Sequence, residues 1–203
     1  SAASDVYKRQ DFSLEDDYYG DTRFHIPFIA WYQVMNASLA LTTMEVLKDR
    51  IPVTMEQLQA GIANTRWQGR METILPGVIV DGAHNEDGVR RFVETAERFQ
   101  KEYPLTLLFS AVNDKDYQDM IHTICSRIKF RKVVTTEVGG YREVPSAELA
   151  EIFCKEGCKD VGNSDNIEEA FHMAHEAKGE DGMLFCVGSL YLVGEIKTLL
   201  LKK

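Results

Sequence analysis

The stretch Val78-Ile79-Val80-Asp81-Gly82-Ala83-His84-Asn85 decides the fold of this chain. Its apolar run leads into a tight turn, and apolar residues at helical spacing come next, which is typical of a strand, a turn and a helix. The turn places a carboxylate, an imidazole and an amide at the carboxyl end of the strand. Ligands bind at this edge of open α/β sheets, so the turn is the first candidate site. The helical positions are Val89, Phe92, Val93 and Ala96.

The turn favours a hydroxyl-rich ligand over a bare phosphate. A helix N-terminus offers free backbone N–H groups to an anion. Here, however, Glu86 and Asp87 already complement the helix dipole and would repel an uncovered phosphate. A ribose held by Asp81 fits better. The alternative that stays open is that Asp81 or Asn85 only caps the turn.

Strands and helices alternate after residue 64, which predicts an α/β domain over residues 65–203. We expect a Rossmann-like, mostly parallel sheet with helices on both faces. The turn Pro76-Gly77 predicts one antiparallel strand, paired in a hairpin with the strand at 78–81. The expected strands are 70–75, 78–81, 105–112, 132–138, 159–161 and 183–187, and the expected helices start near Glu86, Tyr117, Pro145, Asp165 and Leu190.

The N-terminal third has a different character. Residues 1–23 are polar without periodicity, and we expect them to be irregular. Whether they belong to the natural protein stays open. Residues 24–64 predict two helices: an apolar one over 26–49, with Pro27 in its first turn, and a short one through Ala63. The second helix opens with a capping box, Thr54 to Gln57. We expect these helices to lack a sheet and to end another unit that begins upstream.

Charge and composition exclude several classes of partner. The net charge is −9 and the pI about 5.1, whereas nucleic acids and anionic membranes select basic surfaces. No apolar stretch is long enough to cross a bilayer, and no signal peptide is visible. We therefore expect a cytoplasmic location, and free thiols for the four cysteines.

Three further positions could contribute to a site. Arg70, beside a glycine at a strand start, could contact a phosphate bidentately, or be a surface arginine. Asn113–Asp116 follows an expected strand and could bind a polar ligand or cap a helix. Gly188-Ser189 could bind an anion or form an ordinary turn.

A zinc site and the standard nucleotide loops are not expected. Cys154, Cys158, His172 and His175 loosely resemble a Cys2His2 pattern, but the histidine spacing is one residue short, so we assign no metal ligand. The chain has no G-x-x-x-x-G-K-[ST] loop, no G-x-G-x-x-G and no nucleophile elbow. It cannot by itself cradle a triphosphate in a standard way.

Five segments, in order, resemble the C-terminal part of the folylpolyglutamate synthase and dihydrofolate synthase family of the Mur ligases. They cover about residues 24–201 and are individually weak but specific as an ordered set. Tyr32 and Gln68 stand where the family has His and Pro. The segments are Tyr32-Gln33-Val34-Met35-Asn36-Ala37-Ser38-Leu39-Ala40, Trp67-Gln68-Gly69-Arg70, Asp81-Gly82-Ala83-His84-Asn85, Asp114-Lys115-Asp116-Tyr117 and Gly188-Ser189-Leu190-Tyr191-Leu192-Val193-Gly194-Glu195.

The resemblance implies an ATP- and Mg²⁺-dependent ligase. Such an enzyme activates a folate γ-carboxylate as an acyl phosphate and lets the amine of L-glutamate attack it; many bacterial relatives also use dihydropteroate. The P-loop and the Mg²⁺ carboxylates of the family lie upstream of the matching region, so we expect these 203 residues alone to be inactive. The resemblance also implies a monomer, with residues 24–64 closing a central ATPase domain.

The resemblance implies a role for each matching residue. Asn36 would contact adenine, Arg70 the ATP phosphates and Asp81 the ribose. His84 would lie close by at a domain interface, with Asn85 supporting the turn, and Ser189 would line the glutamate side. His84 and Arg70 are the candidate catalytic residues. Two alternatives remain: a peptidoglycan-type Mur ligase, and a Rossmann-like nucleotide-binding module without catalysis.

Overall fold

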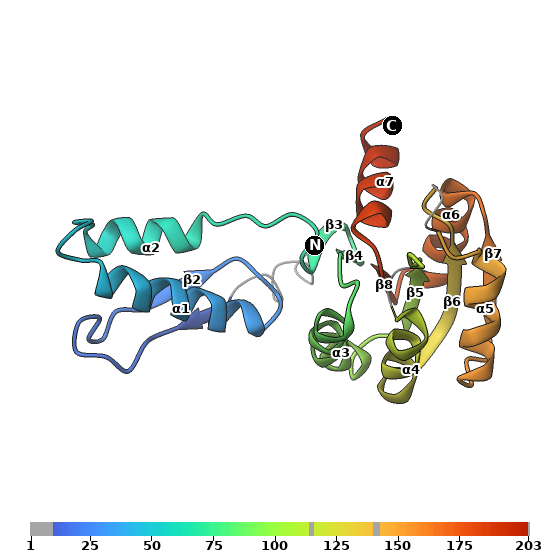
Figure 1. The fold of residues 1–203 in the computed structure, drawn as a ribbon, viewed down its shortest axis with the longest axis horizontal. Coiled ribbons are helices and arrows are strands. Elements are labelled where there is room, and N and C mark those ends of the chain that lie inside the picture. Colours follow the sequence, from blue (N-terminus) through green and yellow to red (C-terminus); the bar gives the residue numbers. More distant parts are fainter. Residues whose placement is uncertain (1–9, 114–115, 140–142, 203) are drawn as a thin grey trace. The chain divides into compact units, whose positions relative to one another are not determined.

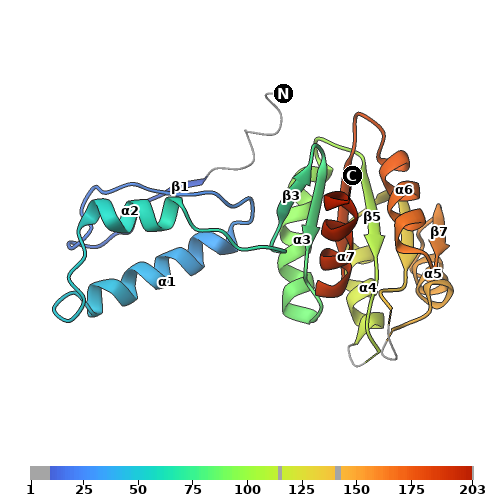
Figure 2. The ribbon, with the colours of Figure 1, turned by 90° about the horizontal axis from the view of Figure 1, so that it is seen from above.

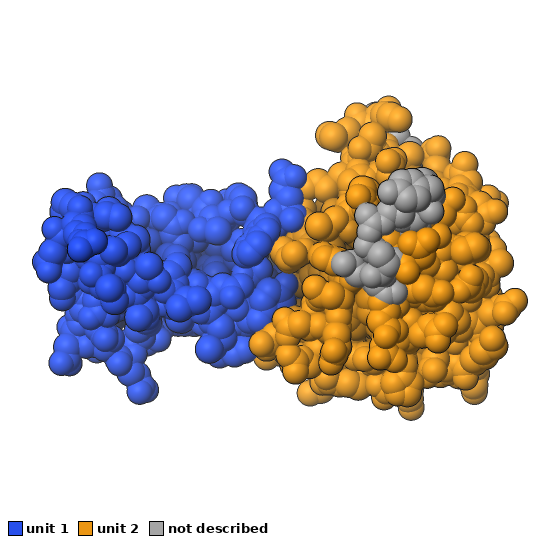
Figure 3. Space-filling model, in the orientation of Figure 1, with its two compact units in different colours: residues 1–68 blue, residues 69–203 orange. Residues whose placement is uncertain are grey.

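The computed structural model describes residues 10–113, 116–139 and 143–202, and the chain divides into two compact units, residues 1–68 and 69–203 (Figure 3). Asp114-Lys115, part of one of the five segments that carry the resemblance, lies outside the described residues. No helix of the described part is long and apolar enough to cross a membrane.

The first unit contains a small sheet that the sequence did not reveal. Strand β1 (Gln10–Phe12) pairs antiparallel with β2 (Phe24–Ile26), with Gln10 opposite Ile26. Our expectations that residues 1–23 are irregular and that the two helices have no sheet were therefore wrong for residues 10–12 and 24–26. Strands of three residues are too short to show an alternating pattern. The strand segment and the loop after it still supply core residues: Tyr19 is buried and donates its hydroxyl to the Leu41 carbonyl at 2.6 Å.

Two helices complete this unit: α1 (Tyr32–Val46) and α2 (Met55–Ala63) (Figure 1). The helix expected over 26–49 is shorter at both ends, and Pro27 lies before it rather than in its first turn. Residues 24–26 are held in the sheet, and the Gln10 side chain donates to the Phe28 carbonyl at 2.8 Å. The predicted capping box is confirmed: Thr54 Oγ1 accepts from the Gln57 N–H, and Gln57 Oε1 accepts from the Thr54 N–H.

The second unit is the predicted α/β domain. Its sheet has the order β3-β4-β8-β5-β6-β7, in which β3 is antiparallel to β4 and every other neighbouring pair is parallel. The expected fold class, including the hairpin and its single antiparallel strand, is confirmed. The strands are β3 (Glu72–Leu75), β4 (Val78–Asp81), β5 (Leu105–Phe109), β6 (Phe130–Thr136), β7 (Val161–Ser164) and β8 (Met183–Val187).

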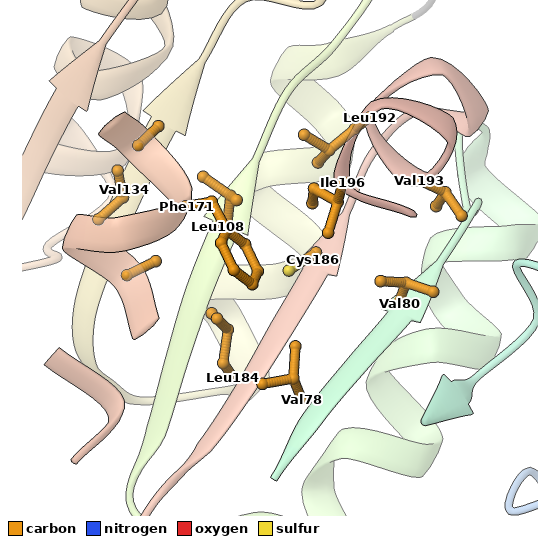
Figure 4. Close-up of a cluster of buried hydrophobic side chains, with 12 residues drawn as sticks. Val78, Val80, Leu108, Val134, Phe171, Leu184, Cys186, Leu192, Val193 and Ile196 are labelled. Atoms are coloured by element: carbon orange, nitrogen blue, oxygen red, sulfur yellow. The ribbon is translucent and has the colours of Figure 1, made fainter. Parts of the chain in front are cut away.

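Helices cover both faces of this sheet, as Figures 1 and 2 show. On one face, α6 and α7 form a cluster with residues of β4, β8, β5 and β6. Figure 4 shows Ile196 next to Cys186 on this face, and Val78 beside Leu184 further along the strands. On the other face, Phe185 packs edge-on against two phenylalanines of α3. The helices are α3 (Glu86–Gln100), α4 (Tyr117–Arg127), α5 (Ser146–Lys155), α6 (Ile167–Lys178) and α7 (Leu190–Leu201).

The central strands are buried on both faces, which explains their continuous apolar sequences. All four residues of β4 and all five of β5 are buried. Four strands differ from expectation in their bounds. Strand β3 begins at Glu72 rather than at 70, and β5 ends at Phe109 rather than at 112. Strand β6 covers Phe130–Thr136 rather than 132–138, and β7 covers Val161–Ser164 rather than 159–161. The helix expected to start near Asp165 begins at Ile167, and Asn166 rather than Asp165 caps it, by accepting from the Glu169 N–H.

Candidate functional site

Three turns meet at the carboxyl edge of the parallel sheet. Strand β8 lies between β4 and β5, and its last residue, Val187, is paired with both Asp81 and Phe109. The segments that leave these strands are the Asp81–Asn85 turn, the Gly188-Ser189 turn and the start of the Ser110 loop. The strand order therefore brings together residues that are more than 70 positions apart in sequence.

Asp81 holds two segments of backbone with its two carboxylate oxygens. Oδ2 accepts from the Met71 N–H at 2.9 Å and Oδ1 from the Ala83 N–H at 2.8 Å. The side chain is almost fully buried, with a relative exposure of 3%. Burial raises the pKa of Asp81 to about 6, although both hydrogen bonds and the charges of Arg70 and His84 act in the opposite direction. Asp81 is therefore an organising group of the site, whatever ligand the site takes.

The Trp67–Arg70 loop is fastened to the same turn by further bonds. The Gly82 N–H donates to the Gly69 carbonyl at 2.8 Å, and the Gly69 N–H donates to Glu72 Oε2 at 2.8 Å. Lys197 of α7 pairs with the Glu72 carboxylate at 2.8 and 3.0 Å. This network joins β3, the loop, the Asp81 turn and α7. Neither Glu72 nor Lys197 could be singled out from the sequence, because neither belongs to a local motif.

Met71 occupies a strained backbone position beside Arg70. Its φ is +44°, in the left-handed region that residues with side chains rarely adopt. The side chain is buried and its N–H is held by Asp81, so packing and the hydrogen bond together maintain the conformation. Such strain is concentrated at functional sites. Here it lets the chain turn sharply between Arg70 and β3.

Arg70 lies against the Gly82 backbone. A Cβ at Gly82 would come within 3.0 Å of the Arg70 guanidinium and would collide with the Leu190 side chain. Glycine at this position therefore lets the arginine approach the turn. The Arg70 side chain is half-buried, and its guanidinium is within 3.4 Å of the Gly69 carbonyl. The structure thus places Arg70 beside the Asp81 turn; its contact with a phosphate stays a prediction.

His84 presents one ring nitrogen as an acceptor. Its Nδ1 lies 2.6 Å from the Gly82 carbonyl oxygen, which can only accept, so Nδ1 carries a proton. In the neutral ring Nε2 is then the unprotonated nitrogen. The side chain is half-buried at the turn. His84 can accept a proton through Nε2 or, when charged, donate through both nitrogens.

Asn85 and Ser189 cap helices. Asn85 Oδ1 accepts from the Gly88 N–H at 2.8 Å at the start of α3, and Ser189 Oγ accepts from the Tyr191 N–H at 3.1 Å at the start of α7. The capping interpretation of Asn85 is therefore confirmed. Ser189, for which we expected an anion site or an ordinary turn, caps a helix; a ligand role for either residue stays a prediction. Asp116 likewise caps α4 by accepting from the Asp119 N–H.

Ser110 is a polar residue at this edge that the sequence analysis missed. It is fully buried, and its hydroxyl has no hydrogen-bond partner among the described residues. Its carbonyl oxygen faces Gly188, whose φ is +112°, so that a Cβ there would fall on this oxygen. The only sequence signal was its place directly after an apolar strand.

Asn36 belongs to the other unit. It is exposed on α1, and its amide donates to Gln33 Oε1 at 2.9 Å. Its contact with adenine stays a prediction.

The described residues supply no ready metal site. No group of three or more His, Cys, Asp or Glu side chains is arranged in them to hold an ion. The four residues that resemble a zinc pattern have other neighbours: Cys158 lies 3.5 Å from Cys125, and the His175 ring stacks on Phe171.

Several known proteins are similar to this chain in sequence and in fold. Residues 69–190 match the family described as Mur ligase, glutamate ligase domain. The dihydrofolate synthase/folylpolyglutamate synthase of Bacillus subtilis is 30% identical over 194 residues, which are 92% of this chain and 43% of that protein. The chain thus spans less than half the length of this curated relative.

Two solved structures resemble the chain at comparable identity. A Mycobacterium tuberculosis folylpolyglutamate synthase, complexed with ADP and AMPPCP, gives a TM-score of 0.74 at 25% identity and covers 87% of this chain and 42% of its own. The Thermotoga maritima folylpolyglutamate synthase gives a TM-score of 0.70 at 26% identity, over 90% and 42%. The family match spans more than half of the sequence, from the loop before β3 to the start of α7. The chain therefore belongs to the Mur ligase family, and residues 69–190 form its glutamate ligase domain.

Proposed function

We propose that this chain is the C-terminal part of an ATP-dependent ligase that adds L-glutamate to the γ-carboxylate of folates and also to dihydropteroate. The observation that carries the proposal is the joining of the Trp67–Arg70 loop to the Asp81–Asn85 turn through Asp81 and Gly82. These two motifs, which ten residues separate in the sequence, are thus held next to each other. The names of the B. subtilis, M. tuberculosis and T. maritima relatives support the choice of acceptor.

The chemistry requires two displacements. A carboxylate oxygen of the acceptor attacks the γ-phosphorus of ATP and ADP leaves; the glutamate amine then attacks the acyl phosphate carbon and phosphate leaves. Both steps build negative charge on phosphoryl oxygens, which a fixed cation stabilises. Arg70 is the residue we assign to this task, because its guanidinium is held beside the Gly82 backbone.

We assign the remaining groups as follows. Asp81 holds the turn and uses a remaining lone pair to accept a hydrogen bond from a ribose hydroxyl. His84 accepts a proton through Nε2 at the same turn. Asn85 supports the turn by capping α3. Ser189 lines the glutamate side and Asn36 contacts adenine. Mg²⁺, which neutralises the phosphates in such reactions, has no fitting ligand set in the described residues, so its ligands would come from elsewhere in the full-length protein.

An apolar stripe on α1 supports the assignment of residues 24–64 to a central ATPase domain. Trp31, Met35 and Leu39 follow one another at spacings of four, so they share one helix face, and each is more than half exposed. An exposed stripe of this kind marks a packing surface. We propose that it packs against the rest of the ATPase domain.

We further propose a cytoplasmic monomer. The four cysteines are free thiols, which is typical of a reducing compartment. Sedimentation of the full-length protein tests the oligomeric state.

The experiment is ADP release by the full-length parent with ATP and L-glutamate, in the presence of dihydropteroate, tetrahydrofolate or a muramyl-peptide acceptor. Release with tetrahydrofolate supports the folate ligase, and release with dihydropteroate adds the second activity. Release with the muramyl acceptor alone would establish the peptidoglycan-type alternative. Nucleotide binding without release for any acceptor would establish the non-catalytic module.

A further inference from the structure

Two cysteines, one in a helix and one just beyond the end of another, meet at the edge of the sheet opposite the candidate site. Cys125 lies in the last turn of α4, and Cys158 follows the end of α5. Their sulfurs are 3.5 Å apart although the residues are 33 positions apart in sequence. Because these helices run antiparallel to the strands, their C-terminal ends lie at the amino edge of the sheet, away from Asp81 and His84.

The backbone holds Cys158 in place. The Cys158 N–H donates to the Phe153 carbonyl at 3.0 Å, and the Gly157 N–H donates to the Cys154 carbonyl at 3.1 Å. Gly157 has a φ of +92°, so this is a helix end closed by a left-handed glycine. The neighbouring Cys154 is exposed on α5 and provides a natural comparison thiol.

The two sulfurs have unequal acidity. Either sulfur can donate the S–H that joins the two residues. When Cys125 donates, the bond lowers the pKa of the Cys158 thiol, against the effects of burial and of Glu156. The same bond raises the pKa of Cys125, and burial adds to this rise. The thiolate is the nucleophile in disulfide exchange, so Cys158 is the attacking group and Cys125 the resolving group.

The pair opens onto a cavity of about 440 Å³. Its lining includes both cysteines, the apolar side chains of Ile128 and Phe130, and two lysines, Lys129 and Lys159. Glu156 also lines it, but its carboxylate is engaged by His122 Nδ1 at 2.9 Å. The cavity therefore offers net positive charge and room for a small anionic reagent beside the sulfurs.

We propose that Cys125 and Cys158 form a modification site for anionic low-molecular-weight disulfides, which convert the pair reversibly into an intramolecular disulfide. The Cys158 thiolate attacks one sulfur of the reagent, forms a mixed disulfide and expels one thiolate. Cys125 then loses its proton and attacks the Cys158 sulfur, and the second thiolate leaves. In sum, two protein thiols are oxidised to one disulfide, and one reagent disulfide is reduced to two thiols.

The test uses the 203-residue chain in glutathione buffers that range from fully reduced to fully oxidised. Remaining thiols are blocked and the peptides are mapped by mass spectrometry. We expect a Cys125–Cys158 cross-linked peptide that appears with oxidation and disappears on return to reduced glutathione. No cross-link at any ratio, or a cross-link of Cys158 to Cys154, would overturn the proposal.

Variants separate the roles of the two sulfurs. Cys125→Ser should trap glutathione on Cys158, with a mixed disulfide that lasts at least about tenfold longer than in the parent chain. The matched control Cys154→Ser should leave the Cys125–Cys158 cross-link unchanged. Equal lifetimes in Cys125→Ser and the parent, or loss of the cross-link in Cys154→Ser, would contradict the assignment.

The charge of the reagent tests the cavity. Oxidised glutathione, which is anionic, should cross-link the pair at least about tenfold faster than cystamine, which is cationic. In Lys129→Gln/Lys159→Gln this preference should disappear while the cross-link still forms. Equal rates for both reagents in the parent chain would refute the anionic class.

Discussion

The carboxylate of Asp81 accepts a hydrogen bond from the backbone N–H of Met71, ten residues earlier, at 2.9 Å. The hairpin sets up this contact: Glu72 pairs with Val80, so the residues just outside the pair, 71 and 81, come opposite each other. A strand pairing thus places the Arg70 loop over the Asp81 turn.

Asp81→Asn should release one of the two backbone N–H groups that Asp81 holds. The amide has one acceptor oxygen, and its NH₂ group would face a donor. An unsatisfied buried group costs about 1–3 kcal/mol, so hydrogen exchange at Met71 or Ala83 should accelerate roughly 10- to 100-fold. NMR-detected exchange measures both amides. The control Asp87→Asn alters an exposed carboxylate on α3 and should leave both rates unchanged; full protection in Asp81→Asn would disprove the two-bond arrangement.

Asp81 should make the free energy of unfolding decrease as the pH rises, which is the opposite of the usual effect of a carboxylate. Its folded pKa of about 6 lies above the ordinary value of 3.8, so the folded state binds the proton more tightly than the unfolded state. The stabilisation is complete below about pH 4 and is lost as the pH rises through about 6, by roughly 3 kcal/mol at most.

This contribution is measured as the difference in unfolding free energy between the parent chain and Asp81→Asn from pH 4 to pH 7. Other carboxylates cancel in the difference, which should move in favour of the asparagine variant as the pH rises. The ¹³C resonance of the Asp81 carboxyl should titrate near pH 6. A midpoint below pH 4 would show that the two N–H donors outweigh burial.

Two glycines near the start of α7 should respond oppositely to alanine. Gly188 has a φ of +112° and faces the Ser110 carbonyl oxygen, so Gly188→Ala should destabilise the domain by roughly 3 kcal/mol or more. Gly194 lies inside the helix with nothing within 4 Å of a new Cβ, so Gly194→Ala should stabilise by about 0.5–1 kcal/mol. Urea unfolding followed by circular dichroism compares them, and a tolerated Gly188→Ala would mean that the turn can rearrange.

Arg70→Ala, in the full-length enzyme, should lower kcat at least about 100-fold with a smaller change in KM, because the charge that Arg70 meets develops in the transition state. Steady-state ADP release with ATP, L-glutamate and the active folate acceptor measures this. Arg90→Ala removes an exposed arginine of α3 and is the matched control. If the two variants were equally active, Arg70 would have no place in the site.

The 203-residue chain by itself should show no ligase turnover. It carries no G-K-[ST] phosphate loop, and its described residues form no metal site. The same ADP-release assay, at the concentrations used for the full-length parent, checks this. Sustained glutamate ligation by the chain alone would contradict the proposal that the phosphate loop and the Mg²⁺ ligands come from elsewhere in the full-length protein.

The sequence was sufficient for those parts of the fold that rest on local patterns. Continuous apolar runs such as Val78–Asp81 marked the buried strands, and Thr54 with Gln57 marked a helix start. It was insufficient where short elements gain their stability from distant partners. Strand β1 has three residues, and Tyr19 enters the core through a bond to Leu41, 22 residues away.

The candidate site divides in the same way. The Asp81–Asn85 turn and Arg70 could be singled out from residue types, and the structure brings them together. The supports could not: Met71 adopts a positive φ, Glu72 binds Lys197 across 125 positions, and Ser110 is a buried hydroxyl without a pattern. These depend on strand register and on packing, which no single segment encodes.

The edge strands of the six-stranded sheet, β3 and β7, have four residues each. The pairing of β3 with β4 also shifts register between Thr73 and Leu75. The unpaired N–H and C=O groups of an edge strand can pair with a strand from another molecule. A short or irregular edge strand has too few aligned groups for such pairing to be stable. The short edge strands therefore protect the domain from edge-to-edge aggregation. A concentrated solution of it should remain free of fibrils even though its central strands are among the most apolar segments of the chain.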